Sequence, residues 1–436
     1  MIAEFLRASL NACRIPIFRH QLWCSLLLVL GYRICAHLTV LPINEAVINN
    51  LVRSSTFMEY FYALFSAGAI DHFSLFSLGI LPVFMAQSII APFFRLNDPI
   101  RQRRLERYVT FWVAFVLSLL LYRYIYLQVN DEETIAIMQK FSIKLYVIIS
   151  MIAASMLLTW VCDKASEHTI IKPYDLLIIS NLSYFLANCF IINGVHIIGG
   201  LVLIVVLYIF FLMSTLIMQA IRRIPIQTPK KVVGTKMYAG QNSVLPVSFI
   251  NSSAFQQAIT AYFFLILIIH EGLSLSFEPS RLTTLEATFL DIGNISTKSG
   301  FIFFSIFFAF FYFIYLRTLV NPVEIAENLR KSNHYIPGLR PGKMTADFLK
   351  SVISRLSVAG VLSVIAILFG GLAIGIQINR YVGLLSIFAT EPVLAFILIH
   401  RTAGIISDGL ASLESQLQTQ IYEGFLKAGR LRGRRT

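Results

Sequence analysis

The sequence predicts an all-α polytopic membrane protein with ten transmembrane helices. Its 436 residues are 57% hydrophobic and 14% charged, with a mean hydropathy of +0.72. A soluble domain carries about 25% charged residues. Ten apolar stretches are each long enough to cross a hydrocarbon core, which takes roughly 20 helical residues. The basic residues gather between these stretches, as they do in the loops of membrane proteins.

The predicted spans follow one another along the whole chain. The first apolar run is followed by no small-residue cleavage pattern, so we expect a retained span and not a signal peptide. The fifth and sixth spans are separated only by the tight turn "NGVH". In order, the spans are 21–41, 74–94, 108–128, 143–162, 174–193, 196–219, 254–274, 300–319, 352–376 and 390–411.

The positive charge has a definite distribution. Most of the 36 Lys and Arg residues lie in the N-terminal segment, after spans two, four, six and eight, and in the tail. The positive-inside rule then places both termini in the cytosol, which requires an even number of spans. A net charge of +13 is therefore interpreted as a topology signal and a partner surface.

One segment does not fit a simple crossing. Residues 55–73, "STFMEYFYALFSAGAIDHF", are apolar and aromatic but are interrupted by Glu59, Gly68 and Asp71. The segment predicts a re-entrant half-helix shielded from lipid by protein. The alternative is an amphipathic helix lying on the outer membrane surface.

The sequence offers no evident catalytic or metal chemistry. It contains no HExxH, GxSxG or P-loop pattern, and we expect no cofactor and no metal site. The five cysteines, which include no CxxC pair, are interpreted as small buried hydrophobes. Charges deep in the spans are limited to Arg33 and the pair His400–Arg401, for which structural pairing is the simplest explanation.

Several blocks, in order along the chain, resemble the SecY family, which forms the central subunit of the Sec protein-conducting channel. The loop after span eight, "NPVEIAENLRKSNHYIPGLRPGK", and the loop after span six, "RRIPIQTPKKVVGTKMYAGQNSVLP", are the most specific. "YRICAHLTVLP", "FSLFSLGILPVFMAQSII" and the tail "SDGLASLESQLQTQIYEGFLK" are similar to further family motifs.

The resemblance implies two pseudo-symmetric halves around a central pore. The N-terminal half would be 1–194, with spans one to five, and the C-terminal half 195–436, with spans six to ten, cytosolic loops at about 220–252 and 320–351, and a basic tail. Spans two and seven would form a lateral gate. The re-entrant segment would be a plug helix, with the plug residues Phe57, Phe61, Leu64, Gly68 and Ile70.

The resemblance also implies an apolar pore ring. Ile178 and Leu182 match it in span five, and Ala258 or Ile259 in span seven, of which we take Ile259. In span two the register allows Phe84 with Ser88 or Met85 with Ile89, and we favour the second pair because both are apolar. In span ten the family motif is absent, and anchoring on Asp408 places Arg401 near a ring position, where its charge would weaken the seal.

The resemblance also implies that the two basic loops dock a ribosome or a SecA motor. For a ribosome, Lys and Arg would give salt-dependent contacts to the phosphates of its RNA. The expected docking residues are Arg222, Arg223, Lys230, Lys231, Arg330, Lys331 and Arg340. Other implied partners are small membrane subunits resembling SecE and SecG, signal peptides, nascent chains and the lipid bilayer.

The implied function is translocation of unfolded, signal-bearing polypeptides and lateral release of transmembrane segments into lipid. We expect a bacterial cytoplasmic membrane, with a plastid thylakoid membrane as the alternative. Two other functions remain open: a secondary transporter for small solutes, which needs coupling-ion ligands at midplane, and an enzyme acting on lipid-linked substrates.

Overall fold

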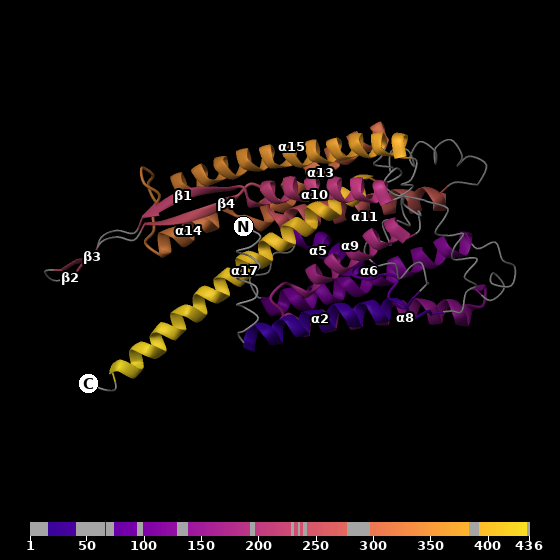
Figure 1. The fold of residues 1–436 in the computed structure, drawn as a ribbon, viewed down its shortest axis with the longest axis horizontal. Coiled ribbons are helices and arrows are strands. Elements are labelled where there is room, and N and C mark those ends of the chain that lie inside the picture. The colour runs from indigo at the N-terminus through magenta and orange to yellow at the C-terminus, as the bar shows by residue number, and fades with distance from the viewer. Residues whose placement is uncertain are drawn as a thin grey trace. The chain divides into compact units, whose positions relative to one another are not determined.

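The computed structural model describes residues 16–40, 66, 74–93, 99–128, 138–191, 197–227, 231–233, 236–238, 242–276, 297–382 and 392–433. Most of these residues are helical (Figure 1). The helices are α2 (Pro16–Ala36), α5 (Leu81–Phe93), α6 (Pro99–Gln128), α8 (Phe141–Ala165), α9 (Pro173–Ile191), α10 (Ile197–Gln219), α11 (Ser252–Ser276), α13 (Lys298–Leu319), α14 (Pro322–Lys331), α15 (Lys343–Val382) and α17 (Pro392–Gly433).

Each of the ten predicted spans overlaps one of these helices, although α5 covers only part of the second span, and α14 lies between the eighth and ninth. The prediction of a ten-helix all-α membrane fold is therefore confirmed. Within the described residues, five helices are long and apolar enough by themselves to cross a membrane. They run over Ile100–Arg123, Phe141–Ala165, Ser252–Ile269, Ser299–Lys331 and Lys343–Ile374.

Two short antiparallel strand pairs occupy the connection between α10 and α11. Strand β1 (Ile221–Gln227) pairs with β4 (Asn242–Ser248), and β2 (Lys231–Val233) pairs with β3 (Lys236–Tyr238). We predicted a loop here and no strands. We call the β1–β4 pair the hairpin.

The chain divides into two compact units. Unit 1 comprises residues 1–83, 110–192 and 402–436, and unit 2 comprises 84–109 and 193–401. These units are defined by contacts and do not test the predicted division into two symmetric halves at residue 194, which stays a prediction. In unit 1, α9 packs against both α2 and α8.

Unit 2 is built around an aromatic seam between α11 and α13. Phe304, Phe308 and Tyr312 recur every four residues along α13 and are buried, so they form one face of the helix. The Phe304 ring lies 4.9 Å from that of Tyr262, and the Phe308 ring lies 5.6 Å from that of Phe255 (centroid distances). Edge-to-face pairs of this kind stabilise beyond the area that they bury.

Several helices also carry faces that are apolar but exposed. On α13 the exposed apolar residues include Ile302, Ile306 and Phe310, and on α2 they include Leu26 and Leu27. Exposed apolar residues on several long helices mark a surface for another apolar phase. In a membrane protein these faces meet lipid or small membrane subunits.

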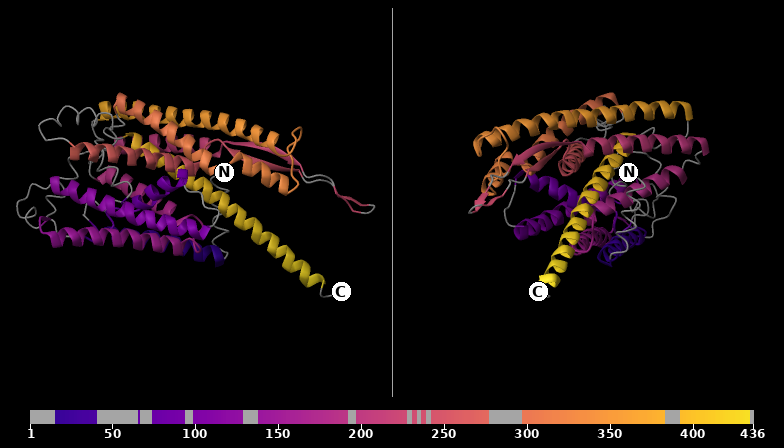
Figure 2. Two further views of the ribbon diagram at one scale, coloured as in Figure 1. Left: turned by 180° about the vertical axis from the view of Figure 1, so that it is seen from behind. Right: turned by 60° about the vertical axis from the view of Figure 1, so that its left-hand side comes forward.

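The loop predicted at 320–351 is mostly helical, because it contains α14 and the first turns of α15. Figure 1 shows β1, β4 and α14 gathered at one end of α10, α13 and α15, all within unit 2. Both views in Figure 2 keep the hairpin and α14 at that same end. The predicted plug residues Phe57, Phe61, Leu64, Gly68 and Ile70 lie outside the described residues; within 55–73 only Ser66 is described.

Candidate functional site

The hairpin takes its shape from an alternating sequence. In "IRRIPIQ", Ile224 and Ile226 are buried while the intervening Pro225 is exposed, which is the period of two that a strand imposes. The register pairs Ile224 with Leu245 and Arg223 with Pro246. Proline lacks an N–H donor and is tolerated in strands that have a free edge.

The base of the hairpin is fixed to the surrounding helices. The Phe249 N–H donates to the Ala220 carbonyl oxygen at 2.9 Å, which closes the chain between α10 and α11. The Asn251 side chain caps α11 by accepting from the Ala254 N–H at 3.0 Å, and the Tyr312 hydroxyl oxygen accepts from the Asn251 N–H at 3.0 Å. Gly360 of α15 approaches closely too, since a Cβ there would lie 2.6 Å from the Phe249 oxygen.

Helix α14 begins and ends at residues suited to those positions. The Asn321 side chain accepts from the Val323 N–H at 3.1 Å, and Pro322 occupies the first turn, where no intrahelical donor is needed. Asn333 adopts a left-handed conformation (φ 58°), and the His334 N–H donates to the Leu329 oxygen at 2.8 Å. These are the features of a Schellman C-cap, which turns the chain sharply after the helix.

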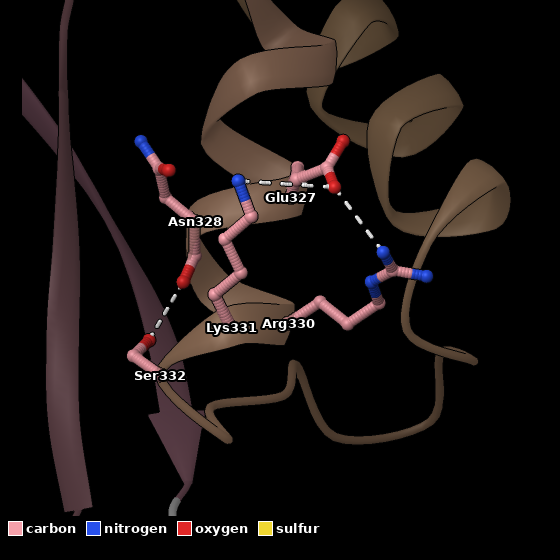
Figure 3. A network of polar contacts seen from close by, with 5 residues as sticks. All are labelled: Glu327, Asn328, Arg330, Lys331 and Ser332. Atoms are coloured by element: carbon pink, nitrogen blue, oxygen red, sulfur yellow. Dashed lines mark hydrogen bonds and ion pairs between the residues drawn. The ribbon is translucent and has the colours of Figure 1, made fainter.

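A small polar network covers the last turn of α14 (Figure 3). One Glu327 carboxylate oxygen lies 3.1 Å from an Arg330 guanidinium nitrogen and 4.0 Å from Lys331 Nζ. The Ser332 hydroxyl donates to the Asn328 carbonyl oxygen at 2.8 Å. Glu327 thus compensates part of the positive charge on both basic residues.

The segment that carries Arg340 is held at both ends. Ile336 is buried, and the Leu339 N–H donates to its carbonyl oxygen at 3.1 Å. The Arg340 carbonyl oxygen accepts from the Thr345 hydroxyl at 2.9 Å. Gly338 (φ 83°) and Gly342 (φ 106°) supply backbone conformations that side chains disfavour. The Arg340 side chain is left exposed.

The hairpin and the segment 320–342, which we call the α14 loop, are joined by an isolated β-bridge. Gln227 and Tyr335 exchange both backbone hydrogen bonds, at 2.9 and 3.0 Å. The Tyr335 hydroxyl also donates to Gln227 Oε1 at 3.4 Å. Neither residue could be picked out from the sequence, because nothing in a single sequence signals one backbone pairing across 108 positions.

The predicted docking residues therefore differ in their surroundings. Arg222, Arg223 and Arg340 are exposed, and no hydrogen bond or ion pair links their side chains to any other part of the described chain. Arg330 and Lys331 are exposed but contact Glu327. Lys230 lies outside the described residues, and Lys231 is placed in β2 by its backbone.

The predicted ring residues are distributed over both units. Met85 and Ile259 of unit 2 and Ile178 of unit 1 are buried, whereas Ile89 and Leu182 are half-buried. Burial does not distinguish the two registers of span two, because Phe84 and Ser88 are buried as well. The Ser88 hydroxyl donates to the Met85 oxygen of its own helix at 2.8 Å. The ring stays a prediction.

The deep arginines have structural partners, as predicted. In unit 1, Arg33 of α2 donates to the Ser180 carbonyl oxygen at 2.7 Å and to the Ser183 hydroxyl at 3.2 Å, both on α9. In unit 2, buried Arg401 donates to the Ser252 hydroxyl at 2.8 Å. Ser252 begins α11 and precedes Ile259 by seven residues, so the guanidinium lies about 10 Å along the helix from that predicted ring residue.

The remaining candidate chemistry is limited. Among the described cysteines, Cys24, Cys35 and Cys162 are free thiols, and Cys162 is buried. No cluster of metal-ligating side chains occurs in the described ranges. What stands out in the described structure is the basic surface formed by the hairpin and the α14 loop, together with apolar residues buried inside two helical units.

These features define a polytopic helical membrane protein that carries a preformed basic surface on its loops. A family model described as SecY matches residues 74–391. The chain is 27% identical to the protein translocase subunit SecY of Aquifex aeolicus, with 98% of this chain and 100% of that protein covered. It is 26% identical to the Thermotoga maritima protein of the same name, with the same coverage.

Solved structures agree on the fold. A chain from a structure described as that of a protein-conducting channel superimposes with a TM-score of 0.61 at 16% identity, covering 91% of this chain and 92% of that one. Sec61 from a canine ribosome–channel complex gives a TM-score of 0.54 at 15% identity, with the same coverage. The chain belongs to the SecY family.

Proposed function

We propose that the protein is the central subunit of a protein-conducting channel, which translocates unfolded, signal-bearing polypeptides across a membrane. One observation carries this: relatives named protein translocase subunit SecY align over essentially their full length and that of this chain. The solved neighbours are protein-conducting channels. The chain is therefore a conduit and not an enzyme.

The mechanism follows from the physics of an apolar constriction. A pore for polypeptide must pass polar backbone yet hold back ions, and a narrow hydrophobic ring seals by dewetting. Met85, Ile89, Ile178, Leu182 and Ile259 supply side chains suited to that ring. The segment 55–73 acts as the plug.

A signal sequence opens the channel sideways. It is itself an apolar helix, and each CH₂ that it moves from water to lipid contributes about 0.8 kcal/mol. Spans two and seven, here α5 and α11, form the lateral gate through which this helix and transmembrane segments leave.

The proposed partners bind either within the membrane or at the cytosolic loops. Small membrane subunits resembling SecE and SecG cover exposed apolar faces such as that of α2. A ribosome or a SecA motor docks on the basic loop surface. The protein lies in a bacterial cytoplasmic membrane, as its bacterial relatives indicate, and the distribution of Lys and Arg supports cytosolic termini.

Reconstituted vesicles test this function. Vesicles containing the protein and its small subunits are given a signal-bearing precursor and a partner motor, and protease protection is measured. We expect import that depends on the signal sequence. Uptake of small solutes without import of the precursor would instead indicate a secondary transporter.

A further inference from the structure

We infer that Gln227 and Tyr335 are positioning residues that combine the two basic loops into one docking surface for a ribosome. This inference rests on the proposed function and specifies how its docking surface is built. The hairpin and the α14 loop leave different helices and are separated by long stretches of chain. Their relative position is set where the two loops touch.

The bridge is well suited to fix that position. Each residue both donates and accepts a backbone hydrogen bond, at 2.9 and 3.0 Å, and the two side chains meet at 3.4 Å. The neighbouring side chains Ile226 and Ile336 are buried, at 5% and 4% exposure. A buried apolar residue therefore lies next to the bridge in each of the two segments that it joins.

The charged residues lie on either side of the bridge. Arg222 and Arg223 precede Gln227 on the same strand, and Arg340 follows Tyr335 by five residues, within the turn fixed by Ile336 and Thr345. Without the bridge, the hairpin would be held at its base and Arg340 at α15, and the spacing of the two charged groups would vary. A partner that binds both groups gains affinity from that fixed spacing.

The charge pattern favours a phosphate surface as the partner. The segment 220–251 contains five Lys and Arg residues and no Asp or Glu. A segment whose charged residues are all basic binds polyanions through counterion release, without repulsion from acidic side chains. Ribosomal RNA presents that chemistry at the membrane, so we assign the surface to the ribosome and treat SecA docking as the competing outcome.

Two single variants separate the backbone pairing from the additional side-chain contact of the Tyr335 hydroxyl. Tyr335→Pro removes the N–H that donates to the Gln227 oxygen, whereas Tyr335→Phe keeps both backbone bonds and loses only the hydroxyl contact. Ribosome binding by the complete channel complex is measured by co-sedimentation. We expect Tyr335→Pro to weaken binding about tenfold or more, because the loops no longer act together, and Tyr335→Phe to bind like the unmodified protein.

A crosslink guards against a trivial folding defect in the proline variant. Two residues that exchange both backbone hydrogen bonds, as Gln227 and Tyr335 do, have Cα atoms about 5.5 Å apart, within the range that a disulfide can bridge. The double variant Gln227→Cys with Tyr335→Cys should crosslink on mild oxidation in membranes, and the locked form should bind ribosomes at least as tightly as the unmodified protein. The mismatched pair Gln227→Cys with Leu339→Cys should not crosslink.

The outcomes are decisive for the inference. Undiminished ribosome binding by Tyr335→Pro, failure of the matched pair to crosslink, or loss of binding in the locked form each overturns it. A bridge effect on SecA binding with none on ribosome binding overturns the assignment of the partner. Failure of the proposed function is seen separately, as absence of precursor import by the unmodified protein.

Discussion

Arg340 and Arg330 show how much surroundings matter for residues of the same type. Both arginines are exposed on the α14 loop, and sequence reasoning assigned both to docking. Arg330 lies 3.1 Å from the Glu327 carboxylate, whereas Arg340 has no such partner within the described residues. An exposed ion pair of this kind contributes about 0–1 kcal/mol to stability, but it reduces the charge that Arg330 offers to a partner.

Charge reversal at these two positions gives the first prediction. Arg340→Glu should strongly reduce translocation of a signal-bearing substrate while the protein still inserts into the membrane. Arg330→Glu should reduce it less, because the native charge is already partly compensated. When the logarithm of ribosome affinity is plotted against the logarithm of salt concentration, the slope for Arg340→Glu should be shallower by the equivalent of about one phosphate contact. Equal transport by Arg340→Glu and the unmodified protein would contradict the docking role.

Arg401 gives the second prediction at this scale. Its guanidinium contacts Ser252, about two helical turns from Ile259. The charge is therefore not expected to weaken the seal. Arg401→Leu should leave the ion leak of closed channels in vesicles unchanged, whereas Ile259→Arg should raise it. A fall in leak on removal of Arg401 would show that its charge reaches the constriction.

At the scale of elements, α15 and the start of α17 pack closely through one glycine. A Cβ at Gly371 would lie 2.2 Å from a ring carbon of Phe396, whereas at Gly370 it would meet nothing within 4 Å. The two adjacent glycines therefore provide a matched pair for measuring this packing.

Thermal unfolding in detergent should separate the two glycines. Gly371→Ala should lower the free energy of unfolding by about 1–3 kcal/mol, because the added methyl group overpacks against Phe396. Gly370→Ala should not lower the free energy of unfolding and can raise it by up to about 1 kcal/mol, because alanine has the better helix propensity. Equal unfolding temperatures for the two variants would contradict the close packing of Phe396 on α15.

The helices could be predicted from sequence and the hairpin could not, for physical reasons. An apolar run of about 20 residues has few alternatives to a helix in lipid. The strands of the hairpin are short, and each contains a proline, Pro225 or Pro246, which argues against a strand when read locally. Ile224 and Ile226 are nevertheless buried in the folded protein, which a reading of local sequence does not reveal.

The basic residues that we propose for docking can be picked out from the sequence, but their arrangement cannot. Their basic character and the glycines of "PGLRPG" are visible in the sequence. The contact of Glu327 with Arg330 follows helical spacing, and could have been found once α14 was recognised. The bridge between Gln227 and Tyr335 is a single non-local contact, which no local pattern reveals.

At the scale of the whole molecule, the fold sorts apolar residues by their surroundings. Ile178 and Ile259 are buried within the protein, whereas Ile149 of α8 and Ile306 of α13 are 55% and 62% exposed on outward faces. Hydropathy alone cannot distinguish these isoleucines. Their separation into inner and outer positions is what a channel in lipid requires.

Photo-crosslinking of a stalled secretory chain tests the central claim most directly. A crosslinking side chain is placed singly at Ile178, Ile259, Ile149 or Ile306 in the reconstituted channel complex. Conduction through the interior predicts adducts with the stalled chain from the first two positions and none from the last two. Adducts from Ile149 and Ile306, with none from Ile178 and Ile259, would contradict a path through the centre of the protein.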